Sequence, residues 1–148
     1  MRHLDLLGTG LKSDFLCDLF ETYDVQVVYE YDRTHEGLAD EYHAELPDLG
    51  LQFVFDAKQV LRTLFLRPVE VSTLNPFNPD DDRIQRFNTK ADAIRYAHEN
   101  GLQFSEGLAE LMGEQKDWIR FKSDTHSIHF EFVDSELRLI TLQAVSAT

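Results

Sequence analysis

The densest group of side chains suited to binding lies between Glu30 and Asp48. This segment holds seven acidic residues and one base, Arg33, and it also contains tyrosines. Carboxylates steer a basic partner toward its binding surface, and tyrosines add contact area at a small entropic cost. The alternative interpretation is an exposed acidic loop whose tyrosines face the core. The predicted partner-binding residues here are Tyr31, Asp32, Glu36, Asp40, Glu41, Tyr42 and Glu45.

A second acidic run lies in an irregular segment that contains three prolines. Carboxylates suit calcium or magnesium, but calcium loops alternate their ligands and include a glycine, and this run does neither. We therefore expect a solvated turn without a metal. Its charge adds three residues to the predicted partner-binding set: Asp80, Asp81 and Asp82.

The usual catalytic motifs do not occur in the sequence. There is no glycine-rich phosphate loop and no Gly-x-Ser-x-Gly elbow, and the lone Cys17 excludes a Cys-x-x-Cys pair. His126 and His129 straddle the start of an expected strand, so they would point to opposite faces rather than share a metal. The sequence thus predicts a protein that is not an enzyme and has no cofactor. A cleft that gathered these histidines or His43 with acids would instead favour a small enzyme.

Composition limits the class of partner. The chain has 148 residues, of which 43% are hydrophobic, and this is enough for one domain, 1–148, with a sizeable core. Its 27 acids against 14 bases give a net charge of −13, which argues against unaided binding to nucleic acid or anionic membranes. The single cysteine, the short apolar runs and the lack of a secretory signal predict a cytoplasmic protein.

Hydrophobic periodicity predicts a mixture of helices and strands. Helical spacing follows Ser13, and Thr89 begins a capped helix that ends near His98. A third helix is expected from Ser105 to Met112. Alternating residues predict strands at 25–31, 42–46, 51–55, 60–66, 118–121, 127–132 and 137–143.

An internal repeat links the two ends of the chain. Three pairs of segments align: Ser13–Phe20 with Ser105–Met112, Phe53–Phe55 with Phe130–Phe132, and Leu61–Leu66 with Leu137–Leu142. The alignment predicts repeats at about 11–66 and 102–143, joined by a linker with an extra helix, 67–101. The fold class is then α+β, with one or two antiparallel sheets and helices on one face. The sequence does not decide between one sheet and two.

The repeat also carries a resemblance to known folds. The run Gly107–Glu114, followed by Trp118–Phe121 and Leu137–Leu142, resembles the BamE-like and beta-lactamase-inhibitor-like folds. With Tyr31-Asp32-Arg33 and Glu36-Gly37, the chain is similar to small acidic immunity proteins of bacterial polymorphic toxin, contact-dependent inhibition and type VI secretion systems.

The resemblance implies a stoichiometric binder that occludes a cognate toxin, with a basic nuclease domain as the expected partner. No individual contact residue is implied, and neither is an oligomeric state. A structural or assembly adaptor that docks a partner through its sheet or a helix face remains the alternative.

Overall fold

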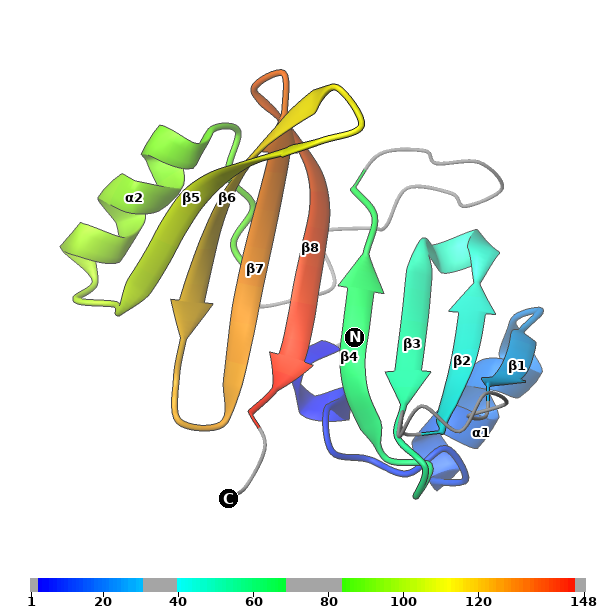
Figure 1. Cartoon of the computed structure of the whole chain (residues 1–148). Helices are drawn as coiled ribbons and strands as arrows, with labels where there is room; N and C mark the ends of the chain where they lie inside the picture. Colours follow the sequence, from blue (N-terminus) through cyan, green and yellow to red (C-terminus); the bar gives the residue numbers. More distant parts are fainter. Residues whose placement is uncertain (1–2, 31–39, 69–83, 146–148) are drawn as a thin grey trace.

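The protein is built around one antiparallel sheet. The computed structural model describes residues 3–30, 40–68 and 84–145. Its sheet has eight strands in the order β1-β2-β3-β4-β8-β7-β6-β5, so the fold is α+β (Figure 1). The elements are the 3₁₀ helices η1 (His3–Leu6) and η2 (Pro47–Leu49), the helices α1 (Asp14–Thr22) and α2 (Lys90–Glu99), and the strands β1 (Gln26–Glu30), β2 (Glu41–Leu46), β3 (Leu51–Phe55), β4 (Leu61–Leu66), β5 (Phe104–Leu111), β6 (Glu114–Lys122), β7 (His126–Val133) and β8 (Glu136–Ala144).

The two halves of the chain join through a single pair of strands. Each half contains an α-helix followed by four strands that pair in sequence order, and the last strand of each half, β4 or β8, lies at the centre. Four residue pairs connect β4 to β8, from Thr63 opposite Gln143 to Leu66 opposite Ile140. The sheet is therefore continuous, which settles the choice between one sheet and two.

Both helices cover the same face of this sheet. Residues directly opposite each other on antiparallel strands share a face, so Phe53, Leu64 and Leu142 form one buried row. Leu16 of α1 belongs to the same hydrophobic cluster as Ala93 of α2. The buried residues thus form one core that extends across both halves, with both helices on one side as expected.

The helix termini follow local sequence signals. Asp14 places a carboxylate in the first turn of α1, where the helix dipole favours negative charge. The Thr89 side chain accepts a hydrogen bond of 3.2 Å from the Asp92 backbone N–H and so caps α2. Both helices lie where the sequence predicts them, as do the strands β1 to β4, β7 and β8, with small differences at their ends. Strand β6 contains the expected strand 118–121 but begins four residues earlier, at Glu114.

The helix expected at Ser105–Met112 is wrong. This segment is strand β5 and the start of its turn, in uninterrupted register with β6. The expectation rested on the alignment with Ser13–Phe20, but Leu108 is 63% exposed and Met112 is 96% exposed, so these apolar side chains do not pack against the core as those of a repeated helix would. Met112 and Gly113 both have positive φ, the geometry of a tight hairpin turn.

This correction changes the internal alignment. The gapless match of Ser13–Phe20 with Ser105–Met112 pairs a helix with a strand. The run Gly107–Glu114, which carried most of the resemblance to the BamE-like and beta-lactamase-inhibitor-like folds, therefore contains no helix. The other two matches survive, because they place β3 with β7 and β4 with β8, which occupy corresponding positions in the sheet. By order along the chain, the counterpart of α1 is α2, which the sequence alignment assigns to the linker. The repeat itself stays a prediction.

None of the helices among the described residues is long and apolar enough to span a membrane.

Candidate protein-binding face

The candidate site is the sheet face opposite the two helices. The strand register places six side chains in one row across this face, from β2 to β6. Both described α-helices pack on the other side, so this face, here called the open face, is left uncovered by them (Figure 1). In order along the row the residues are Glu45, Gln52, Phe65, Thr141, His129 and Arg120.

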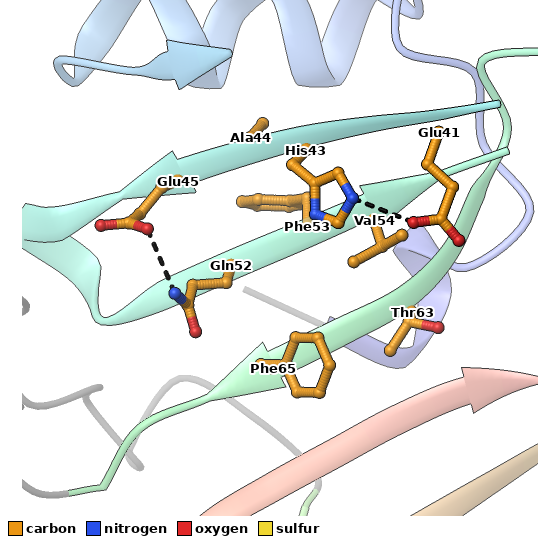
Figure 2. A pocket seen from close by; sticks show the side chains of 9 residues that line it. All are labelled: Glu41, His43, Ala44, Glu45, Gln52, Phe53, Val54, Thr63 and Phe65. Atoms are coloured by element: carbon orange, nitrogen blue, oxygen red, sulfur yellow. Dashed lines mark hydrogen bonds and ion pairs between the residues drawn. The ribbon is translucent and has the colours of Figure 1, made fainter. Parts of the chain in front are cut away.

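The β2 end of the open face is acidic. Glu41 and Glu45 share this face of β2 with His43, whose Nε2 lies 2.9 Å from the Glu41 carboxylate. Gln52 Nε2 donates to the Glu45 carboxylate at 3.1 Å (Figure 2). Arg67 in turn donates two hydrogen bonds to Gln52 Oε1, at 3.1 and 2.9 Å. The acids are thus held in place by neighbouring side chains.

A hollow of about 440 Å³ lies beside these acids. Half-buried Val54 and Phe65 give it an apolar floor, and Thr63 adds a hydroxyl (Figure 2). Protein interfaces commonly combine such an apolar centre with a charged rim. The apolar floor and the acids therefore suit contact with a protein, while His43, which also lines the hollow, is a side chain that a small enzyme could use.

The residues predicted from the sequence are distributed unevenly. Glu41 and Glu45 meet on the open face, whereas Tyr42 lies opposite Phe55 on the core side and packs against the hydrophobic cluster. Half-buried Asp40 directly precedes β2. Six predicted residues lie outside the described part of the chain: Tyr31, Asp32, Glu36, Asp80, Asp81 and Asp82.

The β6 end of the open face is cationic, and none of its residues is among those predicted from the sequence. Lys116, Trp118, Arg120 and Lys122 occupy every second position of β6, and the register puts them all on the open face. The sequence contains a signal for this cationic end, because three basic residues and one tryptophan occupy alternate positions along the strand. An aromatic residue in a strand more often fills a core or an interface, so Trp118 was not selected.

The Trp118 ring is held between neighbouring strands. Its ring centroid lies 5.4 Å from that of His129, and the Arg120 guanidinium carbon lies 5.8 Å from it, a cation–π distance. A Cβ added to Gly107 would lie 2.8 Å from the indole, closer than side chains tolerate, so the ring can keep this position beside β5 because residue 107 is glycine. The ring is therefore positioned before any partner arrives.

The charges around Trp118 are only partly neutralised. Lys116 Nζ lies 3.8 Å from Glu131, whereas exposed Arg120 makes no ion pair with any residue that the structure describes. Burial, reinforced by the positive charge of Arg120, lowers the pKa of His129 below its ordinary 6.5. A pKa below 6.5 leaves His129 largely neutral at pH 7, so the positive charge next to the indole comes from exposed Arg120.

The lowered pKa of His129 makes stability depend on pH. The folded protein binds fewer protons than the unfolded chain between the depressed pKa and 6.5, so the free energy of unfolding falls as pH drops through that window. We expect His129→Gln to reduce this fall, measured by urea unfolding at about pH 7.5 and pH 5.5. Arg120→Gln is expected to reduce it less, because burial contributes more than Arg120. Equal pH dependence in wild type and His129→Gln would contradict the assignment.

Of the three histidines considered in the sequence, only His43 lies with acids in the described part of the chain: it lines the hollow beside Glu41 and Glu45, which is the grouping that the small-enzyme alternative requires. His43 and His129 lie on strands four positions apart in the sheet order, about 19 Å at the usual strand spacing. His126 takes part in a turn network, with Thr125 Oγ1 2.9 Å from its Nδ1. No group of three metal-ligating side chains converges in residues 3–30, 40–68 and 84–145.

Comparison with known proteins leaves the site to be judged on its geometry: neither a family model, nor a curated protein, nor a solved structure matches this chain.

Proposed function

We propose that this protein is an immunity-type inhibitor that binds a cognate bacterial toxin domain and neutralises it by occlusion. The observation that carries the proposal is a continuous eight-stranded sheet with one face that no described helix covers, whose β2 end presents Glu41 and Glu45 beside a hollow with an apolar floor. The toxin surface would be basic, as in a nuclease domain, and the inhibitor would act without catalysis. The net charge of −13 supports attraction to such a partner.

The open face has the dimensions of a protein interface. Eight strands at about 4.8 Å spacing span about 34 Å, and strands of five to nine residues, about seven on average, add about 23 Å in the other direction. The product, about 800 Å², matches the ~800 Å² that each partner buries in a standard complex. Because the sheet is already ordered, little conformational entropy is lost when it binds.

The acids at the β2 end give a direct test. The reading frame immediately upstream would be expressed as the toxin, and growth would be measured with and without this chain. Protection is expected, and the double variant Glu41→Lys with Glu45→Lys is expected to weaken binding at least about tenfold and to reduce its salt dependence, since like charges then face the basic surface. Titration calorimetry at two salt concentrations measures both effects.

A matched control separates local contact from overall charge. Glu21→Lys with Glu99→Lys changes the net charge equally but alters exposed positions at the ends of α1 and α2. This control should retain most of the affinity. If both double variants behave alike, or if the chain does not protect, the proposal fails.

The alternative function, a structural or assembly adaptor, gives more weight to the floor of the same hollow than to the acids beside it. The hollow has Val54 and Phe65 as an apolar floor, which would suit a hydrophobic partner. Such an adaptor would bind with little dependence on salt, so the same titration distinguishes the two functions.

A further inference from the structure

The open face carries a second charged end, of opposite sign. β6 presents Lys116, Trp118, Arg120 and Lys122, in a chain where acids outnumber bases 27 to 14. Of these cations only Lys116 has an ion-pair partner among the described residues, Glu131. The β5 residues opposite them on this face are small: Ala109, Gly107 and Ser105. No bulky side chain of the edge strand β5 therefore covers the cationic side chains at these positions.

The two ends are far enough apart to act separately. β2 and β6 are five positions apart in the sheet order, about 24 Å at the usual strand spacing. The Debye length at physiological salt is about 8 Å, so the carboxylates of Glu41 and Glu45 do little to cancel the potential over Arg120. A net negative protein thus has a locally positive corner.

We propose that Trp118, Arg120 and His129 form a subsite that takes an acidic side chain of the partner protein. The guanidinium of Arg120 is the charged hydrogen-bond donor of this subsite and lies beside the indole. Its N–H groups are available to a partner, because no described residue forms an ion pair with Arg120. The indole supplies apolar contact around the carboxylate, as tryptophan and arginine do at interface hot spots. This inference rests on the proposed function for the identity of the partner.

Neutral His129 contributes to the subsite without adding charge. Its ring lies at 31° to the indole with the centroids 5.4 Å apart, and Arg120 is directly opposite it on β6. Burial keeps the pKa of His129 low, so at pH 7 it supports the indole and leaves Arg120 as the ionic contact. Together with the acids on β2, the subsite would fix the orientation of a partner that bears basic and acidic groups about 24 Å apart.

Trp118 allows a test that needs no toxin. It is the only tryptophan in the chain, so its fluorescence reports on this corner alone. The full-length protein would be titrated with a blocked tetraglutamate peptide at about 0.15 M salt, where the distant acids are screened. A saturable change in emission is expected, and Arg120→Gln should weaken it about tenfold, as for the loss of a charge-assisted hydrogen bond. Tetralysine should leave the emission unchanged.

Two matched variants make the result specific. Arg95→Gln removes the same charge from the exposed face of α2 and should bind the peptide as wild type does. Gly107→Ala would displace the indole and weaken binding, whereas a Cβ at Gly10 meets only an ordinary contact of 3.9 Å, so Gly10→Ala should bind normally.

Three results of the peptide titration alone would overturn the inference: no response to tetraglutamate, equal loss in Arg120→Gln and Arg95→Gln, or an equally strong response to a single-stranded oligothymidine. None involves the toxin, so the subsite and the proposed function can fail separately. If a toxin binds and its affinity survives Arg120→Gln, then the proposed function stands and the carboxylate subsite does not.

Discussion

Phe130→Ala is expected to lower the free energy of unfolding by about 3–5 kcal/mol. Phe130 is 1% exposed, and its ring lies 5.2 Å from Phe87 and 5.5 Å from Phe121, centroid to centroid. Truncation removes the buried ring and leaves a cavity between these partners, which β7 and its neighbours cannot easily close. Urea unfolding followed by far-UV circular dichroism measures the loss.

An exposed phenylalanine provides the control for this loss. Phe15 on α1 is 52% exposed, so Phe15→Ala should change the free energy of unfolding by no more than about 0.5 kcal/mol. If Phe130→Ala does not fold, Phe130→Leu can be used instead, because it leaves a smaller cavity. Its loss of unfolding free energy should lie between those of Phe130→Ala and Phe15→Ala. Equal stability of Phe130→Ala and Phe15→Ala would show that the sheet core does not lie where the structure puts it.

Leu64→Ala is expected to cost about 2–5 kcal/mol and to destabilise both halves together. Leu64 is fully buried on β4 and lies opposite Leu142 of β8, at the junction of the two halves. One hydrophobic cluster extends across that junction, so a cavity there should weaken the whole sheet. Trp118 lies in the other half, on β6, and its fluorescence should show the same shift in midpoint as circular dichroism does.

Independent halves would give a different result. The Trp118 transition would keep its wild-type midpoint while part of the circular dichroism signal was lost at lower urea. Phe15→Ala again serves as the reference, with both probes unshifted. The comparison therefore tests whether four residue pairs between β4 and β8 are enough to couple the halves.

Much of the fold was predictable because its signals are local. Thr89 and Asp92 cap α2 as the sequence indicates, and the alternation in Leu51–Phe55 reflects a strand with one buried face. The segment Ser105–Met112 has apolar residues at helical spacing, yet Leu108 is exposed, and the strand is held by its pairing with β6 rather than by a buried stripe. Tertiary pairing there overrides the apparent helical spacing.

The candidate site was only half predictable. Charge density pointed to Glu41 and Glu45, but the apolar floor beside them comes from β3 and β4 and depends on strand register. The corner around Trp118 draws on β5, β6 and β7, and the need for Gly107 follows from the position of the indole. Such contacts between strands are set by long-range pairing, which composition does not reveal.

The outer strand β5 has a consequence for how copies of this protein avoid one another. The carbonyl oxygen of Gln103 accepts a hydrogen bond from Lys122 N–H of β6. Every second residue of an antiparallel strand bonds to its neighbour and the residues between face away, so the backbone N–H and C=O groups of Glu106, Leu108 and Glu110 point outward from the sheet. Two copies that paired these edges antiparallel around Leu108 would set Glu106 of each against Glu110 of the other. This register would bring four carboxylates together, of which only the two of Glu106 have a described cation nearby, Lys90 Nζ at 3.5 Å, so pairing of the edges in this register is disfavoured.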